Sequence, residues 1–542
     1  MKTPPQVSEA TFNKALRQFE SIIGKQWVFT SDDDVALYKD AYSPLRGEPD
    51  ERVASAALAP SSVEEVRGIM RVANENRIPI YPISTGRNLG YGGSAPALSG
   101  SVVLDLKRMN RVLDVSEPNA SALVEPGVSY FDLYRHIQER GLKVWLDPPD
   151  PGWGSLIGNA LDRGGGQTGT TYRNHFDSHC GMEVVLADGD VLRTGMGAMP
   201  NAQSWQQFKT GFGPWIDGLF SQSNFGVVTK MGFWLMPQPE AHFTGTVTMF
   251  HHADLVPFVD IMNYLENTNV FNGMTFMGSP LLGGVLPGEA NRPIDAELGA
   301  LITRPGGPSA QELEAYCRKV KLGLWSAKFN FYGPEEVARA QWNYCKKRFS
   351  AAIRDVQFED GELLAMPLTP AQLESRHKVF YGVPNLEIFS LVARSATQPP
   401  LYGHVGFSPI IPRTGKAIYE AQRVFADAAR EFGLPVNALN MPFTYWQRAF
   451  VYIFLFPITD DKAVNARNRE AFRKIVKICA EHGWGEYRTP VIYQDDVMAT
   501  YSFNDHALLR FHERVKDAVD PNGILSAGRY GIWPKHLRKP KA

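Results

Sequence analysis

The chain has 542 residues, of which 44% are apolar and 11% aromatic, and its 56 basic side chains nearly balance 57 acidic ones. This length exceeds one ordinary hydrophobic core, so we expect two or more domains. The balanced charge gives no electrostatic basis for binding nucleic acid or an anionic membrane, and a small, nearly neutral ligand is the better expectation.

The cysteines and the N-terminus indicate neither a metal site nor export. The four cysteines are scattered and form no C-x-x-C pair, so neither a zinc site nor a disulfide framework is indicated. The N-terminal residues lack the apolar core of a secretory signal, and no run of about 18 apolar residues is present to span a bilayer. We therefore expect a cytoplasmic protein; a periplasmic location stays open if a partner carries the export signal.

The first half of the chain predicts an α+β domain. Apolar residues at helical spacing predict a helix over 12–23, and Ser62 with Glu65 predicts a capping box that starts a second helix. Short β-rich runs follow at 102–106, 121–124, 182–192 with a turn at Asp188-Gly189, and 226–236.

A glycine-rich loop, PISTGRNLGYGGSA at 82–95, stands out within this domain. Its glycines allow backbone N–H groups to surround an anion without obstruction by side chains, which favours a phosphate-binding loop. The spacing matches neither G-x-x-x-x-G-K-[ST] nor G-x-G-x-x-G, so the common nucleotide loops do not explain it. A tight surface loop without a ligand is the alternative.

The composition changes after Pro237-Gln238-Pro239, which predicts a second domain. Four strand candidates, 244–250, 328–332, 403–408 and 450–456, are interleaved with helices predicted at 335–353, 415–432 and 461–482. We expect one sheet covered on one face by helices. From Gly485 the chain contains the turn-rich DPNGILSAGRYGIW, which indicates a segment that returns to another surface.

Eight segments in this order make the chain resemble the vanillyl-alcohol oxidase and p-cresol methylhydroxylase family of flavoproteins. The segments are PISTGRNLGYGG, EPGVSYFDLY, DPPDPGWGSLIGNALDRG, GMEVVLADGDVLRTGMGAMP, GLFSQSNFGVVTKMGFWLMP, GHVGFSP, GWGEYRT and VDPNGILSAGR. The resemblance covers about residues 10–535. It implies a two-domain α+β fold: an FAD-binding domain at 1–238, to which 484–542 return, and an α+β substrate cap domain at 239–483.

The resemblance also implies a set of FAD contacts and places the cofactor's pyrophosphate on the glycine loop. The implied contacts are Ser84, Thr85, Gly86, Arg87, Asn88, Gly90, Gly92, Gly158, Asn159, Gly226 and Arg529. Most would act through backbone groups.

His404, in GHVGFSP, is the residue that the resemblance implies to be bonded covalently to FAD. A neutral imidazole has one free nitrogen lone pair, which attack on the flavin 8α-methyl position needs. A lone histidine at the start of a strand is otherwise most often structural. p-Cresol methylhydroxylase attaches its flavin through a tyrosine elsewhere in the chain. A histidine here therefore resembles the oxidases of the family in the flavin linkage, and in that feature only.

Tyr91, Tyr487 and Arg488 are implied to bind the oxygen of a phenol substrate. Two phenolic O–H donors and a permanent positive charge favour the ionised phenolate. Without the resemblance, these residues would be a loop aromatic and an exposed strand end.

Asp150, between prolines in DPPDPGWG, is implied to lie beside the flavin N5 and the benzylic carbon of the substrate. A carboxylate there can activate water or accept a proton. An aspartate in such a segment is otherwise a turn residue, and Asp147 is the competing candidate. Glu486 precedes Tyr487, and alternation would point it to the opposite side.

Two segments depart from the family pattern: 163–176 is two residues longer and richer in glycine, and 444–449 replaces the family's histidine-rich segment. We expect both to border the pocket or its entrance and to admit a bulkier phenol, including lignans such as pinoresinol.

The sequence thus predicts FAD-dependent oxidation of para-substituted, lignin-derived phenols through a p-quinone methide, followed by water addition or by conversion to an aldehyde or alkene. One alternative keeps this chemistry but passes electrons to a cytochrome c or similar carrier instead of O2. A second is an electron-transfer subunit without its own substrate. Relatives assemble, so the resemblance also implies a homo-oligomer.

Overall fold

The computed structural model describes residues 3–282, 293–389, 402–434, 439, 443–446 (backbone) and 448–538. Its helices are α1 (Glu9–Ile23), α2 (Asp32–Ala36), α3 (Val63–Asn76), α4 (Tyr130–Glu139), α5 (Leu156–Leu161), α6 (Leu255–Asn267), α7 (Ala296–Thr303), α8 (Ala310–Val320), α9 (Glu335–Ser350), α10 (Pro370–Glu374), α12 (Gly415–Phe432), α13 (Lys462–Glu481), α14 (Gln494–Thr500) and α15 (Phe503–Val519).

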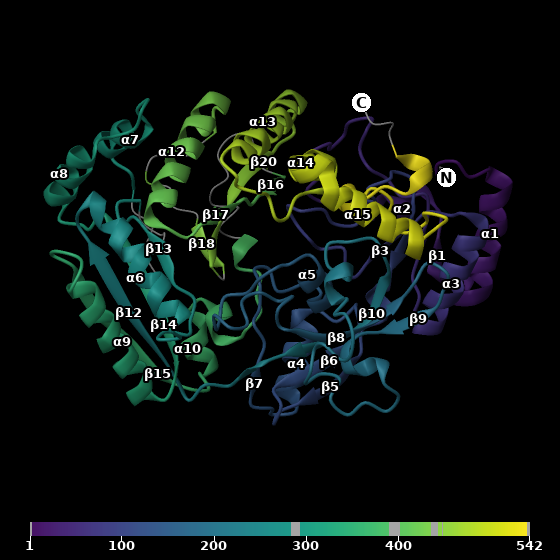
Figure 1. The fold of residues 1–542 in the computed structure, drawn as a ribbon, viewed down its shortest axis with the longest axis horizontal. Coiled ribbons are helices and arrows are strands. Elements are labelled where there is room, and N and C mark those ends of the chain that lie inside the picture. Colours follow the sequence, from purple (N-terminus) through teal and green to yellow (C-terminus); the bar gives the residue numbers. More distant parts are fainter. Residues whose placement is uncertain are drawn as a thin grey trace.

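The strands are β1 (Val28–Phe29), β2 (Ala57–Leu58), β3 (Ile80–Ile83), β4 (Val102–Asp105), β5 (Val112–Ser116), β6 (Ser121–Val124), β7 (Val144–Trp145), β8 (His179–Val185), β9 (Val191–Arg193), β10 (Val227–Trp234), β11 (Met236–Pro237), β12 (Ala241–Met249), β13 (Phe276–Gly278), β14 (Trp325–Gly333), β15 (Gln357–Ala365), β16 (Gly403–Phe407), β17 (Ile410–Pro412), β18 (Phe443–Trp446), β19 (Ala449–Tyr452) and β20 (Phe454–Ile458). Helices and sheets are mixed throughout both halves, which confirms the predicted α+β class (Figure 1).

The N-terminal half contains two main sheets, ordered β1-β2-β4-β3 and β5-β6-β10-β8-β9. α3 begins at Ser62 as predicted, because the Ser62 hydroxyl accepts a hydrogen bond from the N–H of Glu65 (3.2 Å). The predicted capping box is wrong by one residue: the Glu65 carboxylate accepts from the N–H of Ser61 (2.6 Å). Ser61 attracts it because its hydroxyl is within hydrogen-bonding distance as well.

The C-terminal segment returns to the N-terminal half, as predicted. The N–H of Ile80 in β3 donates to the carbonyl of Ile524 (2.7 Å), and the N–H of Ser526 donates to the carbonyl of Ile80 (2.8 Å). Lys516 is buried on the same segment, where it pairs with Asp520 (2.8 Å). In Figure 1 the yellow helices α14 and α15 accordingly lie on the same side of the molecule as the purple helices α1 and α3.

The second half does not form the single sheet that we expected. β12 and β14 pair in a sheet ordered β13-β14-β12-β15, with α9 against it, while β16 pairs with β20 and β19 lies between β17 and β18. The 450–456 run is divided at Ile453 into β19 and β20. The strand β16 does not join the β12–β14 sheet; it lies against the glycine loop, where the N–H of Gly406 donates to the carbonyl of Gly90 (2.9 Å).

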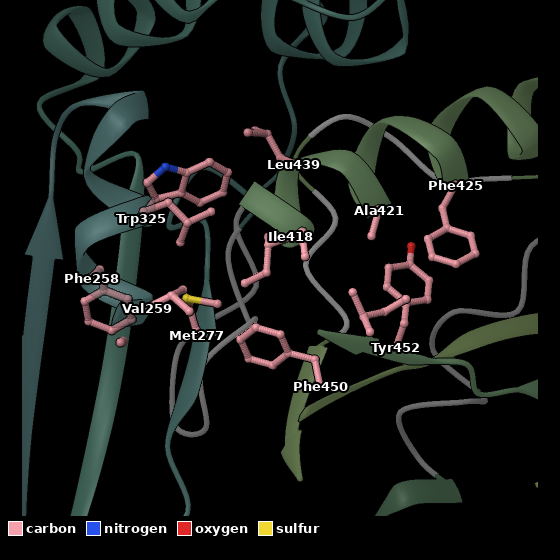
Figure 2. Close-up of a cluster of buried hydrophobic side chains, with 14 of the residues drawn as sticks. Phe258, Val259, Met277, Trp325, Ile418, Ala421, Phe425, Leu439, Phe450 and Tyr452 are labelled. Atoms are coloured by element: carbon pink, nitrogen blue, oxygen red, sulfur yellow. The ribbon is translucent and has the colours of Figure 1, made fainter. Parts of the chain in front are cut away.

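One hydrophobic core joins the separate sheets of this half (Figure 2). Trp325 of β14 and Phe258 of α6 lie at one end of the cluster, and Phe425 of α12 stacks on Tyr452 of β19 at the other, with ring centroids 3.9 Å apart. Two other clusters form the cores of the N-terminal half. Tyr493 and Val497, beyond 484, still pack in the core of the second half, whereas Ile524 and Leu525 belong to a core of the first half; the domain boundaries near 238 and 484 stay a prediction.

In the part of the chain that the structure describes, no helix is both long and apolar enough to cross a membrane.

Removing a large side chain from the second core should destabilise the protein. Phe258 is fully buried, so Phe258→Ala leaves a cavity and is expected to lower the free energy of unfolding by about 3–5 kcal/mol. Chemical denaturation followed by tryptophan fluorescence measures this change. The control is Val337→Ala, at a residue that is 45% exposed, for which we expect less than about 0.5 kcal/mol. Equal midpoints for both variants would contradict the packing described here.

Candidate functional site

The glycine loop takes backbone conformations that favour glycine. The φ angles of Gly86, Gly90 and Gly92 are +67°, +83° and +104°, in the region that other residues rarely adopt. The far end of the loop is held by the buried carboxylate of Asp40, which accepts from the N–H groups of Gly93 and Ala95 (both 2.9 Å). Asp40 was not predicted to take part.

A cavity of about 290 Å³ lies against this loop. It brings together most residues predicted to bind FAD or substrate, namely Ser84, Thr85, Gly86, Arg87, Asn88, Tyr91, Gly92, Asp150, Gly158, Asn159, Gly226, Arg488 and Arg529. Gly90, His404 and Tyr487 are not part of this lining. Tyr487 lines an adjoining cavity of about 300 Å³, which shares Arg488 and Tyr530 with the first.

His404 packs against the outside of the glycine loop. A Cβ atom on Gly90 would lie 3.1 Å from the His404 Nε2, so the loop and the imidazole are in close contact. The edge of the ring also meets Tyr42, with centroids 5.2 Å apart. Burial lowers the pKa of His404 to about 4, so the imidazole is neutral near pH 7 and keeps a free lone pair.

Tyr91, Tyr487 and Arg488 do converge. The Arg488 guanidinium lies 3.8 Å from the ring centroid of Tyr91 and 5.7 Å from that of Tyr487. Its Nε is buried, and among the described residues it has no hydrogen-bond partner. Burial raises the pKa of Tyr487, although the charge of Arg488 opposes this change. A half-buried cation flanked by two phenol rings, with its Nε buried, is thus available to an anionic ligand.

Tyr91 is held in place by the strand that carries His404. Its hydroxyl lies 2.7 Å from the Ser408 Oγ, and the N–H of Ser408 donates to the Glu486 carboxylate (2.8 and 2.9 Å). Glu486 does not line the first cavity, but it lines the second cavity together with Tyr487, so the predicted opposite orientation is wrong: its carboxylate is held there by the N–H of Ser408. Burial raises the pKa of Glu486 well above its usual value. Ser408 lies within the GHVGFSP segment, but nothing in the sequence singled it out.

Asp150, and not Asp147, reaches the cavity. The Oδ1 atom of Asp150 is buried, with no hydrogen-bond partner in the described part of the chain. Asp147 instead accepts from the N–H and the hydroxyl of Thr168 (2.7 and 2.6 Å) and lies 3.3 Å from His175. Burial raises the pKa of Asp150 above its usual value, while His377 and Gln167 oppose the change. Its position is suited to a proton acceptor.

Several residues around the cavity were missed by sequence reasoning. Gln167 donates from Nε2 to Asp150 Oδ2 (2.6 Å), and His377 lies behind Gln167. Asp162 accepts from Asn88 Nδ2 (2.5 Å) and also contacts Arg529. Gln167 lies in the longer 163–176 segment, which was expected to border the pocket. No sequence pattern had indicated that His377 or Asp162 would lie near the site.

The other departing segment is only partly described. Residues 444–449 span the end of β18 and the start of β19. Gln447 and the side chains of 443–446 lie outside the described residues, so their part in the pocket stays a prediction.

The residues present fit FAD. The glycine loop offers backbone groups to a pyrophosphate. The first turn of α5 also lies close to this loop, because a Cβ atom on Gly158 would be 2.3 Å from Ser84 Oγ. Arg529 Nη1 and Arg488 Nε are buried donors without a partner among the described residues. The cation of Arg529 suits the anionic and carbonyl groups of a flavin cofactor, and Arg488 stays available to a second, anionic ligand.

The comparisons with known proteins agree with this site. The FAD binding domain family matches residues 54–195. The chain is 32% identical over 535 residues to the 4-cresol dehydrogenase [hydroxylating] flavoprotein subunit of Pseudomonas putida, covering 98% of this chain and 97% of that protein.

Two solved structures extend the similarity to the whole fold. The 4-ethylphenol oxidase from Gulosibacter chungangensis superposes with a TM-score of 0.81 at 33% identity, covering 99% of this chain and 100% of the oxidase. p-Cresol methylhydroxylase superposes with a TM-score of 0.79 at 31% identity, covering 98% and 99%. The fold and cavity define an FAD-dependent oxidoreductase. The chain belongs to the vanillyl-alcohol oxidase and p-cresol methylhydroxylase family.

Proposed function

We propose that this flavoprotein oxidises para-substituted, lignin-derived phenols at the benzylic carbon through a p-quinone methide. In this proposal, an FAD-binding domain spans 1–238 and 484–542, and a substrate domain spans 239–483. The observation that carries it is the presence of two opposite charges in one cavity: Arg488 and Asp150 both line it, and each has a buried polar atom without a partner among the described residues.

Arg488 and the two tyrosines bind the phenol oxygen as a phenolate. The positive charge and the O–H donors favour the ionised form, which releases electron density toward the para carbon. The guanidinium is buried against Tyr91 at 3.8 Å, so its charge is little screened by solvent. The benzylic C–H then becomes a hydride donor, and bound FAD supplies the hydride acceptor.

Asp150 acts on the p-quinone methide that remains after hydride loss. Its buried Oδ1 takes a proton from water as the water oxygen bonds to the benzylic carbon, and the phenol oxygen regains a proton. The product is a 4-(hydroxyalkyl)phenol. Proton removal from the side chain instead gives an alkene, and a second oxidation of an alcohol gives an aldehyde.

His404 forms the covalent link to FAD in this proposal. Its neutral imidazole lies against Gly90 of the loop that holds the cofactor, which supports a short reach to the flavin. Ser84, Thr85, Gly86, Arg87, Asn88, Gly90 and Gly92 contact the pyrophosphate side, and Gly158, Asn159, Gly226 and Arg529 contact the remainder.

The electron acceptor is O2 or a cytochrome c-type carrier, and the protein works as a homo-oligomer. The names of the relatives include both an oxidase and a dehydrogenase at similar identity, so they do not separate the two acceptors. The longer 163–176 segment borders Asp150 through Gln167, which supports a substrate that differs from small alkylphenols at its para substituent.

An anaerobic panel of p-cresol, eugenol and pinoresinol tests the function. We expect the phenols to bleach the flavin absorbance at about 450 nm with one equivalent of substrate, and pinoresinol to do so fastest. Anisole analogues, which cannot ionise, are the control. Repeating turnover in air with peroxide detection, with and without a cytochrome c, identifies the acceptor. Flavin that no phenol reduces would contradict the proposal and leave the electron-transfer subunit as the alternative.

Arg488→Lys should retain flavin but lose turnover. Lysine keeps the charge, but it cannot lie flat on Tyr91 or present the planar fork, so we expect kcat to fall about 100-fold. Stopped-flow flavin reduction measures this step directly. Arg339→Lys, at a surface residue paired with Glu335, is the matched control and should react normally. Wild-type reduction rates in Arg488→Lys would exclude the assignment.

His404→Ala should break the covalent attachment without preventing cofactor binding. After acid precipitation, we expect the yellow flavin to stay with the precipitated wild-type polypeptide. In the variant, we expect the flavin to be released into the supernatant. His482→Ala, at a surface histidine paired with Glu420, should behave like wild type. Colour that separates from the wild-type chain would show that His404 is not bonded to flavin.

A further inference from the structure

A hydrogen-bonded chain of three side chains runs from the cavity into the second half of the molecule. Gln167 Nε2 donates to Asp150 Oδ2 (2.6 Å), and His377 Nε2 lies 3.1 Å from Gln167 Oε1. The direct distance from His377 Nε2 to Asp150 Oδ2 is longer, 3.8 Å. The amide of Gln167 is therefore the main connection between the carboxylate and the imidazole.

The chain has a fixed direction. An ionised carboxylate only accepts, so Gln167 must present its NH2 group to Asp150 and its carbonyl oxygen to His377. His377 then has to carry a proton on Nε2. The arrangement occupies Asp150 Oδ2, and the buried Oδ1 of this cavity-lining side chain has no hydrogen-bond partner among the described residues. One oxygen of the carboxylate is thus held, and the other is available for chemistry.

The charges around His377 come from three segments. Asp150 and Glu387 each favour its protonated form, while burial lowers its pKa. The two cations beside it in the chain are both paired with carboxylates, Lys378 with Glu387 (2.5 Å) and Arg376 with Glu362 (2.6 Å), so their charges are largely neutralised. The edge of the imidazole packs on Phe380, with ring centroids 4.6 Å apart. His377 is therefore neutral near pH 7 and donates through a fixed nitrogen.

We propose that Gln167 and His377 are positioning residues that orient Asp150 and keep it ionised during oxidation of the phenol. This inference rests on the proposed function of Asp150. Burial alone would favour the protonated, inactive carboxylic acid. The amide donor of Gln167 stabilises the carboxylate, and His377 holds that amide in the donating orientation.

The test is the pH dependence of kcat/KM in matched variants. Gln167→Met removes both amide groups at nearly constant length, and His377→Leu removes the donor to Gln167. His377→Gln retains an N–H donor but does not titrate. His252→Gln is the control, at another half-buried histidine whose pKa is lowered by burial and which stacks on Tyr419 (4.3 Å) away from the cavity.

Asp150 acts when it is ionised, so activity falls as the pH drops through its pKa. Losing a donor to the ionised form raises that pKa, and we expect Gln167→Met to move the acid limb upward by about one pH unit. His377→Leu should shift it in the same direction by less. His377→Gln should restore the wild-type position, and His252→Gln should not move it. We expect little change in KM or in flavin content.

Asp150→Asn separates this inference from the proposed function. If Asp150→Asn is slow while Gln167→Met and His377→Leu keep the wild-type acid limb, the positioning role is wrong and the function stands. If Asp150→Asn reacts at the wild-type rate, the role of Asp150 itself is wrong. Should Gln167→Met fail to fold, the pair His377→Leu and His377→Gln decides: equal pH profiles overturn the proposal, and rescue by glutamine supports it.

Discussion

The rest of the site depends on one close contact between two glycines, Gly90 of the glycine loop and Gly406 of β16. The carbonyl of Gly90 accepts a hydrogen bond from the N–H of Gly406 (2.9 Å). A Cβ on Gly90 would meet the imidazole of His404 at 3.1 Å, and one on Gly406 would lie 2.6 Å from Tyr91 Cζ. Glycine at both positions leaves room for these two side chains, so this contact lets His404 pack on Gly90 and Tyr91 pack on Gly406.

The way in which Arg488 is held preserves its charge for a ligand. A carboxylate partner would neutralise the guanidinium, but among the described residues Arg488 forms no ion pair and lies instead on the face of Tyr91. A ring quadrupole attracts the cation without cancelling its charge. Asp162 acts on it only from a greater distance. Tyr91, fixed in turn by Ser408 and Gly406, therefore serves as the support for the cation.

Local pattern predicted much of the fold. The helix predicted at 415–432 has the bounds that α12 shows, and the turn at Asp188-Gly189 predicted the β8-β9 hairpin. The prediction of a single sheet in the second half was wrong because a sequence pattern identifies a strand but not the strand with which it pairs. The strand β16, for example, is hydrogen-bonded to Gly90, more than 300 residues earlier. Cavity residues followed from the resemblance, whereas His377 meets Gln167 across 210 residues, a contact that only the tertiary fold creates.

Two unpaired opposite charges in one buried cavity are costly unless a ligand bridges them. Arg488 and Asp150 do not pair with each other in the described part of the chain, and each keeps a buried polar atom without a partner. Leaving such groups unsatisfied costs about 1–3 kcal/mol each, more when they are charged. In the proposed function, a phenol with its oxygen at Arg488 satisfies the cation and leaves Asp150 Oδ1 to accept from the water that attacks the benzylic carbon, whereas the reversed orientation would leave the cation without a partner. In this proposal, the position of the cation therefore sets the orientation in which the phenol binds, because only one orientation brings the phenolate oxygen to Arg488.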